Sequence, residues 1–397
     1  MMFTRAAHGG ALPAMLRLAR GGPRTTTRPG KLRPMKAKLL ITVVALVAGL
    51  FFLNRWMNAK KEYIPGTPAA ATPASGEVRN TFTVGFLPVT CHLTCPVTSW
   101  VTKHGDQGTV FEAQRFTDFP SMKEALIARK IDATFMNAPL AMKLVNDGVP
   151  VKIVYLGHRD GTALMVRTDG PIQKFEELAG KTVAIPGRFS NQTIFMHKMM
   201  KEKGMAPDSI ILKELPPPEH PSALAANAID AYIIGEPHAA KAEMEGYGRV
   251  LMHMRDAWPG FISCVLVVRQ ELIDQQRPLV TELVHGIAAS GEWLDEDRDA
   301  GAQHRKDAAV VAGKIYYNQK PELLDFVLTR PIDRVSYTGL LPPKEKFDEM
   351  MTLAVELGIL PKQIAFEEYC DTSFAPDLET VDVPFDRLPQ VEEVAKQ

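Results

Sequence analysis

Short β-rich runs alternate with helical runs along most of this chain, and the alternation is repeated in two successive cycles. In the first cycle the β-rich runs lie at 81–87, 110–116, 131–135 and 151–156. In the second, which follows the Asp169–Gly170–Pro171 turn, they lie within 178–186, at 210–215 and at 229–234. Strands that alternate with helices are typical of α/β proteins with a mostly parallel sheet. The pattern therefore predicts two α/β lobes of similar construction.

The order of the runs also predicts how the chain is divided between the lobes. A further β-rich run at 261–269 follows the second cycle and leads into a mainly helical stretch. We expect the chain to cross between the lobes near 168–171 and to return near 256–262. The predicted lobes are lobe 1, made of 81–168 and 262–397 with the C-terminal helices, and lobe 2, made of 169–261.

Composition excludes several classes of protein. The chain has 397 residues, of which 46% are hydrophobic and 23% charged, as in ordinary globular proteins and unlike disordered or collagen-like ones. Residues 1–61 hold twelve Lys and Arg and no carboxylate, which leaves 62–397 with 34 basic and 46 acidic residues. A body with a formal charge of about −12 is a poor partner for nucleic acid. Four cysteines are too few for a disulfide scaffold.

The N-terminal part is predicted to direct the protein to a membrane. The run LLITVVALVAGLFFL at 39–53 has no charge and follows nine basic residues, so the positive-inside rule keeps the N-terminus in the cytoplasm. We expect a basic tail at 1–38 and a signal or transmembrane anchor at 39–57, which is either cleaved or retained. Met35 is an alternative start of the chain. A linker at 58–80, rich in Pro, Ala and Thr, then holds the body off the membrane.

Two helix starts are marked by their capping residues. Ser121, with Glu124 three residues later, forms a capping box. Ser190 is the predicted N-cap of a helix that reaches about Lys203. The N-terminus of a helix binds anions through its free N–H groups and its dipole, so the second start is also a candidate anion site.

Polar residues follow several predicted strands at their carboxyl ends, which is where doubly wound sheets bind ligands. The candidate ligand-binding residues are Thr90, His92, Thr94, Asn137, Ser190, Asn191 and Glu236. The first three lie between the first strand and a predicted helix. Three of the others have a simpler interpretation, because Asn137 also fits a turn, Ser190 an N-cap and Glu236 a helix cap.

The segment Cys91–His92–x–x–Cys95 leaves three interpretations open. Cysteine and histidine are ligands of soft metals, two cysteines in an oxidising compartment can form a disulfide, and small polar residues can simply line a cleft. The chain has no second Cys/His cluster. We therefore expect no metal and no cofactor, and we expect Thr90, His92 and Thr94 to act through hydrogen bonds to a solute.

Four segments together resemble one family. They are VGFLP at 84–88, ALIARKIDATFMNAP at 125–139, LAGKTVAIPGRFSNQ at 178–192 and ALAANAIDAYIIGEPHAAKA at 223–242. In this order they are similar to the periplasmic solute-binding proteins of the nitrate/sulfonate/bicarbonate group, which also includes binding proteins for thiamine-pyrimidine precursors. The resemblance covers about 80–350. It implies a type II periplasmic-binding-protein-like fold, with two doubly wound lobes, two hinge strands and a ligand in the cleft.

The resemblance also implies a function. The chain would be the non-enzymatic substrate-binding component of an ABC-type importer, with permease and ATPase subunits as partners and a small anionic solute as ligand. Its body would lie at the periplasmic face of the inner membrane, anchored by the N-terminal helix or released after cleavage. The alternative is an enzyme on the same fold, related to pyrimidine-precursor synthesis, that uses Cys91, His92 and Cys95. The motifs G-x-S-x-G, H-E-x-x-H and the P-loop do not occur in the sequence.

Overall fold

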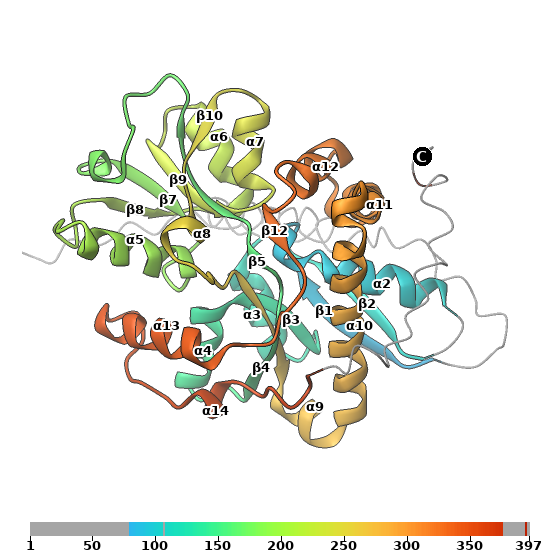
Figure 1. Cartoon of the computed structure of the whole chain (residues 1–397). Helices are drawn as coiled ribbons and strands as arrows, with labels where there is room; N and C mark the ends of the chain where they lie inside the picture. The colour runs from blue at the N-terminus through green and yellow to red at the C-terminus, as the bar shows by residue number, and fades with distance from the viewer. Residues whose placement is uncertain (1–78, 106–107, 376–393, 395–397) are drawn as a thin grey trace, which may run out of the picture. The chain divides into compact units, whose positions relative to one another are not determined.

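The computed structural model describes residues 79–105, 108–375 and 394 (Figure 1). The predicted basic tail at 1–38, the predicted anchor at 39–57 and all but the last two residues of the predicted linker at 58–80 lie outside these residues. No helix within the described ranges is both long and apolar enough to cross a membrane. The chain divides into two compact units, Met1–Pro68 and Ala69–Gln397, and all described residues belong to the second.

The order of the elements follows the predicted alternation. The strands are β1 (Thr81–Phe86), β2 (Val110–Arg115), β3 (Ala133–Asn137), β4 (Val151–Leu156), β5 (Arg159–Asp160), β6 (Thr162–Arg167), β7 (Thr182–Ile185), β8 (Ile211–Glu214), β9 (Ala231–Gly235), β10 (Gly248–His253), β11 (Cys264–Arg269) and β12 (Val335–Ser336). The α-helices are α2 (Thr94–His104), α3 (Phe119–Ile127), α4 (Ala138–Asn146), α5 (Asn191–Glu202), α6 (His220–Ala225), α7 (His238–Met244), α8 (Met254–Ala257), α9 (Gln270–Gln275), α10 (Arg277–Glu296), α11 (Gln303–Val311), α12 (Pro321–Thr329), α13 (Lys344–Glu356) and α14 (Phe366–Tyr369). The shorter turns are η1 (Thr90–His92), η2 (Phe175–Leu178), η3 (Pro217–Glu219), η4 (Arg298–Ala300) and the π-helical η5 (Ala312–Tyr317).

The two main sheets share one plan. The first has the strand order β2-β1-β3-β11-β4 and the second the order β10-β6-β9-β7-β8. In the first, β11 runs antiparallel to both of its neighbours, and in the second β6 does so, while the remaining strands of each sheet run in one direction. The sheets are therefore mostly parallel, as predicted, with one reversed strand in each lobe. Each reversed strand is the first strand of its main sheet that the chain forms after leaving the other lobe, so two segments connect the lobes.

The first crossing lies earlier than predicted. Because β6 belongs to the second sheet, residues 162–168 go with the second lobe and not with the first. The Asp169–Gly170 turn, interpreted from the sequence as the crossing, is the far end of β6. The chain crosses between β4 and β6, where Asp160 (φ 65°) and Gly161 (φ 63°) both take the left-handed conformation that makes a tight turn.

One predicted helix start is also corrected. Helix α3 begins at Phe119, and its N-cap is Asp118, whose carboxylate accepts the N–H of Ser121 at 2.8 Å. Ser121 is therefore the donor to the cap and not the cap itself. An Asp at the N-cap satisfies the same orphan N–H group as a Ser does, and Pro120 fits the first turn because it has no N–H to satisfy.

The central strands are buried on both faces. Every residue of β3 and of β9 is buried, as are the first five residues of β11. Helices cover both faces of a doubly wound sheet, so its strands form continuous apolar runs. Each large side chain buried here contributes about 1.5–3 kcal/mol of hydrophobic stabilisation.

The C-terminal helices contact both lobes and not only the first. Helix α10 packs against α2 of the first lobe, whereas α12 packs against α7 of the second (Figure 1). Helix α13 lies against α4 of the first lobe and α5 of the second. Strand β12 pairs with β5 at the crossing. The C-terminal helices, predicted to belong to the first lobe, therefore also contact the second lobe.

A close approach at Gly157 brings the crossing segments together. The N–H of Gly157 donates to the carbonyl oxygen of Cys264 at 2.7 Å. A Cβ atom at residue 157 would lie 2.0 Å from the carbonyl oxygen of Cys91, which no side chain can tolerate. Glycine at this position therefore allows the loop after β1, the end of β4 and the start of β11 to meet.

Replacing Gly157 by alanine should destabilise the protein by about 1–3 kcal/mol, because the new methyl group forces the Cys91 backbone away. Urea unfolding measures this loss. The matched control is Gly105→Ala, where the nearest atom to the new Cβ is 3.5 Å away, and it should change the free energy of unfolding by less than about 0.5 kcal/mol. Equal losses in the two variants would contradict the close approach.

Candidate functional site

The loop after β1 is buried and held from the C-terminal part of the chain. Thr90, His92 and Thr94 are all fully buried. The Tyr317 hydroxyl donates to the carbonyl oxygen of Val89 at 2.7 Å, and that of Tyr337 to the carbonyl oxygen of Thr90 at 3.0 Å. These two tyrosines thus hold the backbone of the predicted ligand loop through its carbonyl oxygens and use none of its side chains.

His92 is placed as a hydrogen-bond donor. Its Nδ1 accepts the backbone N–H of Leu87 at 2.7 Å, so in the neutral imidazole the proton is on Nε2. Nε2 is buried and has no partner in the protein. The rings of Phe119 and Phe135, with centroids 6.2 Å and 5.3 Å away, fix the plane of the imidazole. The Nε2–H group therefore points at a fixed place without a protein acceptor.

Thr90 connects the two lobes. Its backbone N–H donates to the carbonyl oxygen of Glu236 at 2.8 Å, and its hydroxyl donates to the same oxygen at 3.2 Å. The hydroxyl also lies 2.9 Å from Nε2 of His158, which donates because the Thr90 proton is already used. Burial lowers the pKa of His158 to about 4, so its ring is neutral and its buried Nδ1 is an acceptor without a protein partner.

Both oxygens of the Glu236 carboxylate accept hydrogen bonds from other groups of the protein. One oxygen pairs with the guanidinium of Arg334 at 2.7 Å, and the other accepts the N–H of Ala240 in α7 at 2.8 Å. Arg334 also contacts Glu243 at 3.1 Å. Burial raises the pKa of Glu236, while the Arg334 guanidinium opposes this shift. The structure thus places Glu236 as an ion-pair partner and helix cap, the simpler of its two interpretations.

The N-terminus of α5 lies against the returning segment of the chain. Ser190 is its N-cap, as predicted, and accepts the N–H of Thr193 at 3.2 Å. The side-chain amide of Asn191 donates to the carbonyl oxygens of Ile262 and Ser263, which fixes its orientation. Its Oδ1 is consequently an acceptor, and this atom and Oε1 of Gln192 are buried without a protein partner.

Asn137 and Thr162 complete the site. Asn137 ends β3, is 4% exposed and lies opposite Cys264 in the sheet. Its side chain does not cap α4. Thr162 opens β6, and its hydroxyl is buried without a protein partner. Sequence reasoning missed Thr162, whereas it includes His158, in the 158–160 segment after the β-rich run at 151–156, and Gln192, beside Ser190 and Asn191, as further candidates.

Six of the fifteen buried polar side-chain atoms without a protein partner, counted over the described residues, belong to one connected region. They are Nε2 of His92, Oγ1 of Thr94, Nδ1 of His158, Oγ1 of Thr162, Oδ1 of Asn191 and Oε1 of Gln192. Thr162 pairs with Gly235, the neighbour of Glu236, and Glu236 bonds to Thr90. Asn191 bonds to Ser263, the neighbour of Cys264, whose sulfur touches Cys91 beside His92. A buried polar atom without a hydrogen bond costs about 1–3 kcal/mol, so a set drawn from both lobes indicates a site for a polar ligand.

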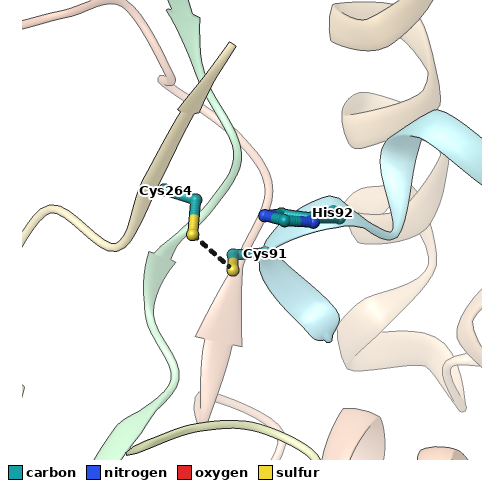
Figure 2. A group of neighbouring side chains, drawn as sticks. All are labelled: Cys91, His92 and Cys264. Atoms are coloured by element: carbon teal, nitrogen blue, oxygen red, sulfur yellow. Dashed lines mark hydrogen bonds between the residues drawn. The ribbon is translucent and has the colours of Figure 1, made fainter. Parts of the chain in front are cut away.

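Cys91 meets Cys264 and not Cys95. The sulfurs of Cys91 and Cys264 lie 2.9 Å apart, with His92 beside them (Figure 2). The sulfur of Cys95 instead faces the carbonyl oxygen of Val84 at 3.9 Å, and burial raises the pKa of its thiol. The grouping of Cys91, His92 and Cys95 as one reactive or disulfide-forming loop is therefore corrected. The sequence could not show Cys264 as the partner, because the two residues meet only through the β11 crossing.

Comparison with known proteins identifies relatives of the chain. The profile of the NMT1-like family matches residues 75–312. The chain is 26% identical over 273 residues to the nitrate import ATP-binding protein NrtC of Synechocystis sp., covering 63% of this chain and 40% of that protein. It is 22% identical over 188 residues to the nitrate/nitrite binding protein NrtA of Nostoc sp., covering 42% of each. The chain thus spans about two fifths of the length of these curated relatives.

Solved structures show the same fold. The nitrate-binding protein NrtA from Synechocystis has a TM-score of 0.67 at 15% identity, with 78% of this chain and 90% of that chain covered. A ligand-binding component of an ABC-type import system from Staphylococcus aureus, solved with zinc bound, has a TM-score of 0.66 at 24% identity, with 77% and 99% covered. The alkanesulfonate-binding protein SsuA from Xanthomonas axonopodis, bound to MOPS, has a TM-score of 0.62 at 14% identity, with 75% of this chain and 100% of that chain covered. The predicted α/β periplasmic-binding-protein-like fold is confirmed.

An enzyme is also found among the structures with this fold. The desulfurization enzyme DszB has a TM-score of 0.53 at 14% identity, with 75% of this chain and 97% of that chain covered. The three structures with higher scores named above are binding proteins. This fold is thus shared by binding proteins and by an enzyme.

Replacing Glu236 by glutamine should destabilise the protein far more than replacing Glu243, although both carboxylates contact Arg334. The side chains of Glu236 and Arg334 are 1% and 3% exposed, whereas that of Glu243 is 34% exposed. Breaking a buried pair costs about 3–5 kcal/mol, and breaking a partly exposed one about 0–1 kcal/mol. Urea unfolding of Glu236→Gln and Glu243→Gln gives both values. A loss below about 1 kcal/mol for Glu236→Gln would refute its structural role.

Proposed function

The chain belongs to the NMT1-like family, and we propose that it is the substrate-binding component of an ABC-type importer, with permease and ATPase subunits as its partners. The observation that carries this proposal is the connected group of six buried polar atoms without protein partners, which come from both lobes and from the segment between them. A solute held between two lobes would supply the missing hydrogen bonds. Relatives named for nitrate import and nitrate binding support the same function.

The proposed solute is a small anion that also carries a hydrogen-bond donor. On the first lobe, the Nε2–H of His92 and the N-terminus of α2 favour an acceptor with negative charge. On the second lobe, the N-terminus of α5 favours the same charge, but the fixed Oδ1 of Asn191 requires a donor. Hydrogencarbonate offers both, whereas nitrate offers acceptors alone. Hydrogencarbonate is therefore the first solute to test.

The candidate residues take two kinds of role in this proposal. His92, Thr94, Asn137 and Asn191 contact the solute through side-chain hydrogen bonds. Thr90, Ser190 and Glu236 hold these contacts in place, since their own polar atoms bond to protein groups. The proposed site needs no metal and no catalytic group.

Binding would act by closure of the two lobes. The bond from Thr90 to Glu236 and the bonds from Asn191 to Ile262 and Ser263 cross between segments that move relative to each other in such a hinge. A ligand stabilises the closed state only by the contacts it makes better there than in the open state. Hydrogen bonds from both lobes to one solute are contacts of that kind.

The body would work at the periplasmic face of the inner membrane. The uncharged run at 39–53, with its basic flank, supports a retained N-terminal anchor or a cleaved signal. The linker at 58–80 would then give the body room to reach a permease.

Replacing Thr94 by valine should weaken solute binding without lowering the stability of the free protein. The hydroxyl is fully buried and has no protein partner, and valine has nearly the same shape. Loss of one neutral hydrogen bond to the solute costs about 0.5–1.5 kcal/mol, or a few-fold to about tenfold in affinity. Calorimetry with hydrogencarbonate, nitrate and an alkanesulfonate measures the affinity, and urea unfolding the stability.

The matched control is Thr352→Val on the exposed face of α13, where the hydroxyl bonds only to the Asp348 carbonyl oxygen at 2.8 Å. It should leave the affinity unchanged. The proposed site would be wrong if Thr94→Val bound every solute as tightly as the wild type. If the wild-type protein bound none of these anions, the proposed solute class would be wrong.

A further inference from the structure

We propose that Cys91 and Cys264 are an oxidation site, a dithiol that closes to an intramolecular disulfide between the ligand loop after β1 and the hinge strand β11. Their sulfurs lie 2.9 Å apart, and both residues are buried, at 4% and 3% exposure. Figure 2 shows one side chain coming from η1 and the other from the start of β11, with the two pointing toward each other. Nothing in the predicted solute site uses either sulfur.

The backbone holds the two cysteines in place. Gly157 donates its N–H to the carbonyl oxygen of Cys264 and packs directly against the carbonyl oxygen of Cys91. Cys264 is also paired with Asn137 in the sheet. The two sulfurs therefore meet because three backbone segments are fixed, so closing the bond requires movement mainly of the side chains.

A metal ion fits this cluster less well than a disulfide does, although Cys91, His92 and Cys264 lie within ligand distance of one another. The 2.9 Å between the sulfurs lies about midway between a disulfide bond of about 2.05 Å and the roughly 3.7 Å between two thiolates on one tetrahedral zinc, so His92 decides between the two. His92 is in the wrong state for a ligand. Because Leu87 donates to its Nδ1, Nε2 carries the proton and has no lone pair to offer.

Cys91 is the nucleophile of the pair. Burial opposes ionisation, yet the hydrogen bond between the Cys91 and Cys264 sulfurs and the nearby His92 lower the pKa of Cys91 well below its ordinary value. Burial and the neighbouring Cys91 raise the pKa of Cys264. A thiolate beside a thiol is the arrangement from which thiol–disulfide exchange starts.

The reaction requires an external disulfide as oxidant. The Cys91 thiolate attacks one sulfur of that disulfide, which forms a mixed disulfide and releases one thiolate. Cys264 then loses its proton to solvent and attacks the sulfur of Cys91, which expels the second thiolate. The two protein thiols are oxidised by two electrons, and the external disulfide is reduced to two thiols.

Access to the pair depends on opening of the lobes, a step that rests on the proposed function. Thr90, next to Cys91, bonds to Glu236 of the second lobe, and Ser263, next to Cys264, bonds to Asn191. Separating the lobes breaks the contacts that flank both sulfurs. A bound solute should therefore slow oxidation, by about 100-fold at 100 times Kd if only the open protein reacts.

The test uses reduced full-length protein exposed to oxidised glutathione without denaturant. Remaining thiols are alkylated in denaturant at successive times, and intact mass and peptide mapping follow. We expect a product two hydrogens lighter, with one peptide pair joined through Cys91 and Cys264. The control Cys95→Ser should form the same product. Cys264→Ser should stop at one glutathione attached to Cys91.

Three outcomes would overturn the proposal. In the first, all four thiols still react with the alkylating agent after prolonged exposure to oxidised glutathione. In the second, the disulfide that forms involves Cys95. In the third, the purified protein holds a stoichiometric metal that protects Cys91 and Cys264. The solute is tested separately by calorimetry of the reduced protein with hydrogencarbonate. Binding without a disulfide refutes only the oxidation site, whereas a disulfide without binding refutes only the proposed solute. If hydrogencarbonate binds but does not slow oxidation, the coupling to lobe opening is wrong.

Discussion

The buried ion pair between Glu236 and Arg334 joins the lobes at the point where the site is built. Glu236 follows β9 in the second lobe, and Arg334 precedes β12, which pairs with β5 at the crossing. The same glutamate accepts two hydrogen bonds from Thr90 through its carbonyl oxygen and caps α7 with its second carboxylate oxygen. A buried pair gives little net stability by itself, but its geometry here fixes the position of the ligand loop. The pair thus helps to hold the residue whose carbonyl oxygen receives both hydrogen bonds from Thr90.

The lobes as they lie in this structure leave several buried polar side-chain atoms without a hydrogen bond from the protein. Each buried polar atom that lacks a partner costs about 1–3 kcal/mol, whereas the same atom in an open cleft would bond to water. His92, Thr94, Thr162, Asn191 and Gln192 all carry such an atom. The hydrogen bonds between the lobes contribute only about 0.5–1.5 kcal/mol each. In the proposed function, the balance between open and closed states depends on what replaces the missing hydrogen bonds, and closure would be coupled to binding in this way.

The sequence predicted the large features of the fold and few of the contacts in the site. Periodicity and turn residues located most strands, and Ser190 was recognised as a cap because capping is a local interaction. The Asp169–Gly170 turn was misinterpreted as a crossing, since turn chemistry does not tell which sheet β6 joins. The role of Glu236 depends on Arg334, nearly a hundred residues away, and that of Cys91 on Cys264. Such pairs are set by tertiary packing, and one sequence holds no local signal for them.

The central claim is that one small anion bridges the two lobes and closes them. Small-angle X-ray scattering of the full-length protein, with and without saturating hydrogencarbonate, tests it most directly. The account predicts a smaller radius of gyration with the solute, and Thr94→Val should need a higher concentration to reach the same compact form. If calorimetry records binding while the radius of gyration stays unchanged, the solute does not close the lobes and the account is wrong.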